Sequence, residues 1–255
     1  MKVLLIDGDI VLFQVAFKSQ QKMFDKLIVD DIIIAQERID DFIRDLVQRT
    51  EAREYLVCLS GFNNFRKQLS STYKLNRADK EKPELLSELR AYVEAEYPCL
   101  YIDNLEADDV IGILVSKRDK EYIIASTDKD MQQISSTHYN WRKDTLFTIT
   151  PEEATRFFYQ QVLQGDPGDG YYGVPGIGKV KARKLLDEVE PEHYWKTVVE
   201  TYLSHGLTYD DALMTARLAF ILDKDHYDCK TKSVKLWTPP KEKEVKKNGD
   251  RYERW

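Results

Sequence analysis

Apolar residues follow two kinds of pattern along the first half of the chain. Short runs without polar alternation are typical of strands buried on both faces, whereas apolar residues at helical spacing indicate helices packed on a sheet. Strands are expected at 2–6, 55–59, 99–102, 122–125, 138–141 and 146–149. Helices are expected at 31–50 and 83–96. This alternation predicts an α/β fold with a mostly parallel central sheet flanked by helices.

The pattern changes after Thr150, where helical spacing predominates. Pro151 favours a helix that begins there and runs to about residue 163. Further helical patterns occupy 193–204 and 210–222. We therefore divide the chain into an α/β domain at 1–150, a helical region at 151–240 and a mixed-charge tail at 241–255, which we expect to be mobile.

Carboxylates gather at the ends of two of the apolar segments. Glu106, Asp108 and Asp109 stand at the head of an amphipathic run, and Asp128 and Asp130 directly follow an expected strand. The helix dipole explains one or two acids in a first helical turn. Five acids in two such places repel one another unless a positive group lies between them, and hard divalent cations are the usual partner. We interpret these acids as the core of a metal site.

The first expected strand ends in Asp7-Gly8-Asp9. Polar sites in parallel α/β sheets lie at the carboxyl ends of the strands, so these acids are placed where chemistry is expected. Asp-Gly is also a common turn signal, and taken alone the motif is better explained as a simple turn.

A basic segment follows the second expected strand. Residues 66–82 carry six basic side chains against two acidic ones, and Phe65 and Tyr73 add aromatic rings. Such a mixture can bind phosphates and stack on bases. A solvated charged loop explains the same segment about equally well.

A glycine-rich hairpin at 173–178 leads into a helix with a basic start. Its cations are Lys179, Lys181, Arg183 and Lys184. Exposed amides and lysines at a helix N-terminus can bind a phosphodiester backbone without sequence preference. A turn that only joins two helices is the alternative, and the basic cluster favours DNA binding over it. Asp166 and Asp169, upstream of the hairpin, are two more candidate metal ligands.

Composition excludes several classes of protein. The three cysteines are widely spaced, so neither a disulfide framework nor a zinc site is expected, and a reducing cytoplasm fits. No run approaches the eighteen or so apolar residues of a membrane span. The net charge of -6 argues against a chain that coats itself with nucleic acid, although local basic surfaces remain compatible with it.

Taken together and in order, these motifs resemble the flap endonuclease and 5′→3′ exonuclease family of PIN-like nucleases. The resemblance covers about residues 1–190 and rests on Asp7-Gly8, Phe65-Arg66, Tyr73-Lys74-x-Asn76-Arg77, Glu106-Ala-Asp108-Asp109, Asp128-Lys-Asp130, and Gly165-Asp166-x-x-Asp169 with the Gly-Val-Pro-Gly-Ile-Gly hairpin. Residues 216–222 and 236–239 are similar to the endings of short phage 5′→3′ exonucleases.

The resemblance implies a site with two divalent ions, Mg²⁺ or Mn²⁺, that hydrolyses phosphodiesters by in-line displacement. The inner carboxylates would be Asp7, Glu106, Asp108, Asp128 and Asp130, with Asp109 supporting them and Asp166 and Asp169 on the side of the second metal. Lys74 and Arg77 would contact the scissile phosphate and offset its developing negative charge.

The resemblance also implies how DNA binds. Residues 67–97 would form a helical arch for a single-stranded 5′ end, and residues 165–190 a helix-three-turn-helix module that grips the duplex and holds K⁺. The expected DNA-binding residues are Arg66, Lys67, Tyr73, Gly176, Gly178, Lys179, Lys181, Arg183 and Lys184. The expected substrates are DNA 5′ ends, gaps or flaps during phage DNA replication, with RNA primers in RNA–DNA hybrids as a further substrate. We expect a monomer without membrane attachment.

Two departures from the family pattern limit these implications. The family usually carries another metal-binding Asp a few residues before Phe-Arg, whereas this chain reads Ser60-Gly61-Phe62-Asn63-Asn64. The hairpin is followed by Val180-Lys181 where the family commonly has Lys-Thr. A structure-specific DNA-binding protein with reduced catalysis is therefore the main alternative. A haloacid-dehalogenase-type phosphatase, suggested by Asp7-Gly-Asp9 and Ser60, ranks lower because it needs neither an arch nor a basic hairpin.

Overall fold

The computed structural model describes residues 2–24, 26–77 and 80–240. A six-stranded sheet lies at its centre, in the order β5-β4-β1-β6-β7-β8. The strands are β1 (Lys2–Asp7), β4 (Glu54–Ser60), β5 (Cys99–Ile102), β6 (Glu121–Ala125), β7 (Thr137–Asn140) and β8 (Thr145–Thr148). Neighbouring strands from β5 to β7 run parallel, and β8 pairs antiparallel with β7. The prediction of a mostly parallel sheet flanked by helices is confirmed.

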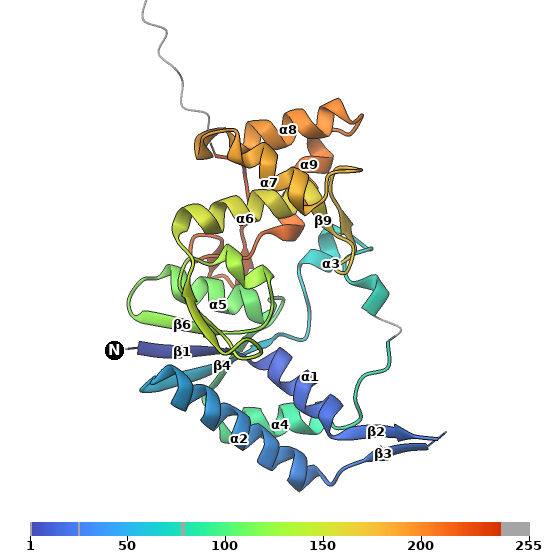
Figure 1. The fold of residues 1–255 in the computed structure, drawn as a ribbon, viewed down its shortest axis with the longest axis vertical. Coiled ribbons are helices and arrows are strands. Elements are labelled where there is room, and N and C mark those ends of the chain that lie inside the picture. Colours follow the sequence, from blue (N-terminus) through green and yellow to red (C-terminus); the bar gives the residue numbers. More distant parts are fainter. Residues whose placement is uncertain (1, 25, 78–79, 241–255) are drawn as a thin grey trace, which may run out of the picture.

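The central strand β1 shows why its apolar run has no alternation. Leu4 and Ile6 face one layer of the core, whereas Val3 and Leu5 face the other. The first layer is formed by α1 (Gly8–Lys18), α2 (Ile32–Thr50) and α4 (Leu86–Glu96), and the second by α5 (Ala107–Ser116). Figure 1 shows these helices on opposite faces of the sheet. Both faces of β1 are therefore dry, as the pattern predicted.

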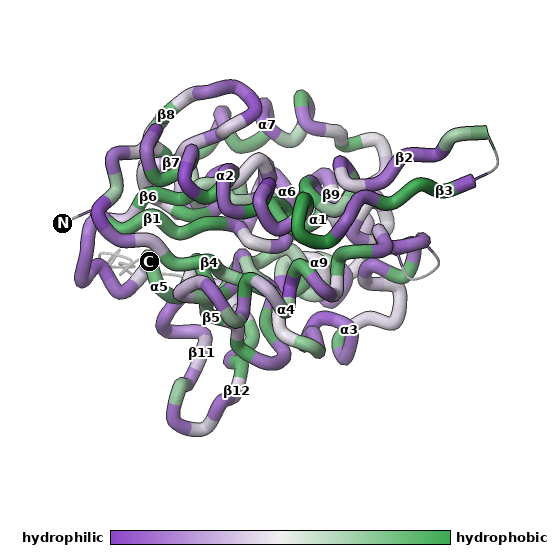
Figure 2. The backbone as a smooth tube through the Cα atoms, turned by 90° about the horizontal axis from the view of Figure 1, so that it is seen from below, coloured by the Kyte–Doolittle hydropathy of each residue, from purple (hydrophilic) through white to green (hydrophobic). Residues whose placement is uncertain are grey.

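A hairpin interrupts the expected connection between the first strand and the helix at 31–50. It consists of β2 (Gln20–Met23) and β3 (Lys26–Val29), which pair antiparallel. Figures 1 and 2 show it reaching away from the body of the molecule. Apolar residues such as Leu27 and Ile28 are exposed on it. The sequence analysis did not predict this hairpin, because its strands are short and bury few side chains.

The C-terminal half packs its helices around a second core. Its elements are α6 (Pro151–Gln164), α7 (Lys179–Asp187), α8 (Tyr194–Ser204), α9 (Tyr209–Ala219) and the short strands β9 (Gly165–Asp166), β10 (Tyr171–Tyr172), β11 (Tyr227–Asp228) and β12 (Ser233–Val234). Thr150 and Glu153 form a capping box around Pro151, which explains where α6 begins. The last helix, α9, ends at Ala219 and not at the expected residue 222. The chain leaves the helix there because the Phe220 carbonyl accepts a hydrogen bond from the guanidinium of the buried Arg66.

The segment expected to form an arch contains two short turns and one core helix. The turns are α3 (Arg66–Leu69) and a 3₁₀ helix at Leu75–Arg77. The helix α4 packs on α1 and α2, and its Leu89 and Val93 are fully buried. These contacts show that α4 belongs to the core of the domain. The arch boundaries at 67–97 and the division into domains stay predictions. The tail at 241–255 lies outside the described residues.

No helix in the described parts of the chain is long and apolar enough to cross a membrane.

If α4 belongs to the core, shortening Leu89 to Ala should lower the free energy of unfolding by about 2–5 kcal/mol, because the side chain leaves a cavity between three helices. Glu88→Ala, one residue earlier on the exposed face of α4, is the matched control and should change it by less than about 0.5 kcal/mol. Urea unfolding followed by circular dichroism measures both. Equal, small effects would show that α4 does not contribute to the core.

Candidate active site

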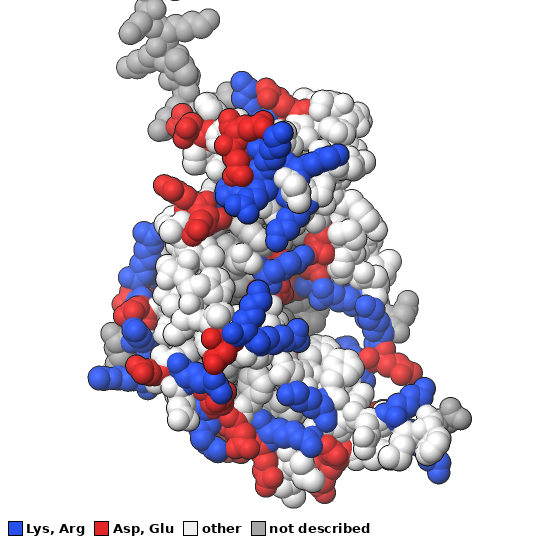
Figure 3. Space-filling view, viewed as in Figure 1, with Lys and Arg blue, Asp and Glu red and all other residues white. Residues whose placement is uncertain are grey.

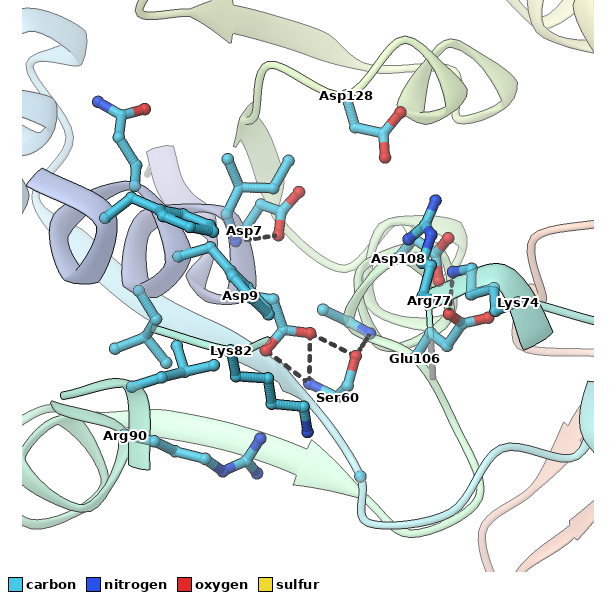
Figure 4. Close-up of a pocket in the computed structure, with 18 of the residues that line it drawn as sticks. Asp7, Asp9, Ser60, Lys74, Arg77, Lys82, Arg90, Glu106, Asp108 and Asp128 are labelled. Carbon is cyan, nitrogen blue, oxygen red and sulfur yellow. Dashed lines mark hydrogen bonds and ion pairs between the residues drawn. The ribbon is translucent and has the colours of Figure 1, made fainter. Parts of the chain in front are cut away.

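The sheet ends in a cavity lined by acids from three separate segments. Its volume is about 1070 Å³, and the acidic and basic groups around it include Asp7, Glu106, Asp108, Asp128, Lys74 and Arg77. Figure 4 shows these side chains converging on one space. The cavity lies at the carboxyl ends of β1, β4 and β6, where ligand sites in parallel α/β sheets are found.

Asp7 links the central strand to the first helix. Its side chain caps α1 and accepts a hydrogen bond from the Ser126 hydroxyl at 2.7 Å. Burial, together with the negative charges of Asp9 and Asp128, raises the pKa of Asp7 to about 7 against the lowering effect of the Ser126 hydrogen bond. Ionising a carboxyl group in these surroundings costs free energy, and a bound cation would offset that cost.

The start of α5 contributes the densest group of carboxylates. Glu106 is the N-cap of this helix, and oxygens of Glu106, Asp108 and Asp109 lie within 4.8 Å of one another. Burial, together with the charges of Asp109 and Glu106, raises the pKa of Asp108 well above its ordinary value. Burial would also raise the pKa of Glu106, but Lys74 and Arg66 outweigh it and lower that pKa to about 2.

A second group of acids lies next to the first, beyond Asp128. Asp130 accepts a hydrogen bond from the Gln161 amide at 2.7 Å, and Asp166 pairs with Lys129 at 2.8 Å. Burial, together with the charges of Asp128, Asp166 and Asp169, raises the pKa of Asp130 to about 7, although Lys129 opposes this. The two acids expected on the side of the second metal, Asp166 and Asp169, therefore act electrostatically on Asp130, which was expected among the inner carboxylates. Asp128 links them to the first group.

One cation bridges these groups, and a second pairs with one of them. Lys74 pairs with Glu106 of the first group and, at 3.5 Å, with Asp169 of the second. Arg77 also pairs with Asp169, while its side chain remains about half exposed. Both residues line the cavity, as expected for side chains that would meet a phosphate.

The donor set fits hard divalent ions. The acidic groups that face the cavity are all carboxylates, and burial raises the pKa of three of them, Asp7, Asp9 and Asp108. Oxygen ligands of this kind suit Mg²⁺ or Mn²⁺, and a bound cation would stabilise the ionised forms that burial disfavours.

Three of the expected site residues are buried and contact other residues of the site. Arg66 is 1% exposed and donates to both oxygens of Asp109, at 2.7 and 2.8 Å. Tyr73 is also buried and donates its hydroxyl to Glu106 at 2.8 Å. Arg66 and Tyr73 therefore contact carboxylates in this structure, and their contact with DNA stays a prediction. Asp109 was expected to support the inner acids, and both of its oxygens accept from Arg66.

One cavity residue was missed as a site residue. Asp9 accepts hydrogen bonds from the Ser60 hydroxyl and from the Ser60 amide at 3.2 Å. Burial raises the pKa of Asp9, although the two bonds from Ser60 oppose this effect. The sequence signal for Asp9 was the motif Asp7-Gly8-Asp9. Because a simple turn explains the same motif, Asp9 was not predicted as a site residue.

The expected DNA-binding hairpin lies apart from the cavity, at the start of α7. Gly176 has φ +75°, a conformation that favours glycine, and an added Cβ at Gly176 or Gly178 would meet nothing within 4 Å. The side chains of Lys179, Lys181, Arg183 and Lys184 are exposed, as is Lys67. Figure 3 shows Lys and Arg side chains in a band from the helical region to the middle of this face.

The fold and the acidic cavity define a class of protein, an α/β domain with carboxylates at the ends of its parallel strands. Residues 2–162 match the family model of the 5′-3′ exonuclease N-terminal resolvase-like domain. The chain belongs to this family. The phosphatase alternative is therefore set aside.

Known proteins are similar over most of the chain. The exodeoxyribonuclease of Enterobacteria phage T3 is 26% identical over 93% of each chain. The flap endonuclease Xni of Shewanella halifaxensis is 34% identical over 61% of this chain and 68% of its own. A structure of T5 5′-exonuclease with zinc bound covers 86% of this chain and 93% of that one, at 17% identity and a TM-score of 0.65, and so has the same fold.

The raised pKa of Asp7 predicts a pH effect on the metal-free protein. Between about pH 4 and pH 7 the folded chain holds a proton on Asp7 that the unfolded chain has lost, so stability falls as pH rises through this window. In EDTA, lowering the pH from about 7.5 to 5.5 should therefore raise the Tm, by roughly 2–4 °C for each kcal/mol gained. Asp7→Asn should flatten this slope. Equal slopes in thermal scans of both proteins would contradict the assignment.

Proposed function

We propose that this protein is a divalent-metal-dependent 5′→3′ nuclease that hydrolyses DNA phosphodiesters at 5′ ends, gaps or flaps in phage DNA replication. The observation that carries the proposal is the cavity in which Asp7, Glu106, Asp108 and Asp128 face Lys74 and Arg77. The membership of the family and the names of the nuclease relatives support it.

Each group has a role that its position supports. Asp7, Glu106, Asp108 and Asp128 would hold one ion, and Asp130, Asp166 and Asp169 would help to hold a second, with Asp128 between them. When bound, the ions would activate the attacking water and stabilise the leaving oxygen. Lys74 and Arg77 would donate to the non-bridging oxygens of the scissile phosphate and so orient it. Burial around these groups strengthens the electrostatic interactions.

We further propose that residues 165–190 act as a helix-three-turn-helix module that binds the duplex backbone. The open hairpin at 173–178 and the exposed lysines of α7 support this role. Carbonyls of the hairpin would bind K⁺. One of them, the Gly176 carbonyl, already contacts a cation, because it accepts a hydrogen bond from the Lys181 ammonium at 3.0 Å. We also propose that the protein acts as a monomer and accepts RNA–DNA hybrids, which the cleavage experiment below can include.

A second candidate function is structure-specific DNA binding with reduced catalysis, which Ser60 favours because it stands where the family usually has an acid. Incubation with 5′-labelled duplex, flap and RNA–DNA hybrid substrates, with and without Mg²⁺ or Mn²⁺, separates the two. The nuclease should release short labelled products only with the metal. Binding without cleavage under every divalent ion tested would overturn the enzymatic function.

Asp128→Asn should reduce turnover at least about a hundredfold, because a neutral amide weakens the hold on a cation between the two groups of acids. DNA binding in Ca²⁺ should remain within about threefold, since the fold and the basic surface are unchanged. Asp210→Asn, an exposed first-turn acid on α9, is the control and should retain full turnover. Near-normal cleavage by Asp128→Asn in single-turnover assays would remove Asp128 from the ligand set.

Replacing Lys179 and Lys181 together by Ala should weaken duplex binding and reduce the slope of log K against log [salt] by about 2, because two phosphate contacts would be lost. Lys2 and Lys120 lie near the amino ends of β1 and β6, at the opposite edge of the sheet from the cavity. Their double Ala variant is therefore a charge-matched control and should retain the original slope. Fluorescence anisotropy across a salt series measures both variants, and identical slopes would argue against the module.

A further inference from the structure

The end of β4 contains a hydroxyl where a metal site of this family usually has a carboxylate. Ser60 is the last residue of β4, and its hydroxyl accepts a hydrogen bond from the Ala107 amide of α5 at 3.1 Å. The same hydroxyl donates to Asp9. Ser60 therefore lies between α1 and α5, the two helices that carry acids into the cavity.

Asp9 brings a carboxylate to this same position from another element. It lies in the first turn of α1, two residues after Asp7, and lines the cavity. Its side chain reaches the hydroxyl and the backbone amide of Ser60, 51 residues away in the chain. Figure 4 shows its carboxylate beside Ser60, on the same side of the cavity as Asp7. The end of β4 has no acid, but Asp9 places a carboxylate directly beside Ser60.

Helix capping alone does not explain Asp9. Acids in a first helical turn commonly complement the helix dipole from an exposed position. In α1, however, Asp7 is already the N-cap and accepts from the Ile10 amide at 3.4 Å. Asp9 instead points across to β4, and a carboxylate has about four acceptor sites, more than Ser60 fills. Arg90 is a positively charged residue on the same cavity wall, and it makes no ion pair with Asp9 among those in the described structure.

We infer that Asp9 supplies the carboxylate that the end of β4 lacks, and that it binds a divalent ion together with Asp7 and Asp108 while Ser60 holds it in position. This inference rests on the proposed function, because it assigns one more ligand to the same metal site. The carboxylate would then come from α1 instead of β4 and would line the same cavity.

Direct metal binding tests the inference without an activity assay. Mn²⁺ binding is followed by electron paramagnetic resonance and calorimetry in the absence of DNA. Asp9→Asn keeps an acceptor for Ser60 but removes the charge, and should weaken one Mn²⁺ site at least about tenfold. The exchange variant Asp9→Ser/Ser60→Asp returns the acid to β4 and should recover most of that loss. Asp210→Asn should bind Mn²⁺ like the unchanged protein.

The outcomes separate the two proposals. Unchanged Mn²⁺ affinity in Asp9→Asn, with tight binding by the natural sequence, would overturn the role of Asp9 and leave the proposed function intact. If the natural sequence binds no Mn²⁺, both fail. Thermal unfolding in EDTA shows whether each variant folds. If Asp9→Asn does not fold, the exchange variant decides, and its failure to bind Mn²⁺ while folded would overturn the inference.

Discussion

The buried ion pair between Arg66 and Asp109 is the interaction on which the rest of the site depends. The guanidinium donates to both carboxylate oxygens and to the carbonyls of Leu218 and Phe220, and Asp109 accepts from the Leu222 amide at 3.0 Å. One pair therefore joins α3, α5 and the segment after α9. Removing either partner would leave a buried charge alone, which costs about 3–5 kcal/mol.

The position of Lys74 depends on this pair. Arg66 also donates to Glu106, the N-cap of α5, at 3.1 Å, and the same carboxylate accepts from the Tyr73 hydroxyl and from the Lys74 ammonium. The backbone of Lys74 is fixed as well, because its amide donates to the Asp169 carbonyl at 2.7 Å. Gly170 allows this approach, since a Cβ there would collide with the Thr72 carbonyl. Lys74 is thus oriented by both halves of the chain.

The sequence predicted those features that depend on local patterns. Strands, most helices and the acids at strand ends follow from apolar runs and from the resemblance. Asp7, Glu106, Asp108 and Asp128, which were expected in one site, line one cavity in the structure. The roles of Arg66 and Tyr73 could not be predicted in this way. A basic or aromatic residue looks the same in sequence whether it meets DNA or a carboxylate, and the partners of the Arg66 guanidinium lie 40 and more residues away.

The cavity brings acidic and basic side chains into one space. Five carboxylates, those of Asp7, Asp9, Glu106, Asp108 and Asp128, line the cavity, and Lys74 and Arg77 are already engaged by acids. Four more cations, Lys18, Lys82, Arg90 and Arg142, line the same cavity. The exposed cations of α7 lie on a different element and can attract the duplex. Burial raises the pKa of Asp7 and Asp108, and a divalent ion in the cavity would stabilise their ionised forms.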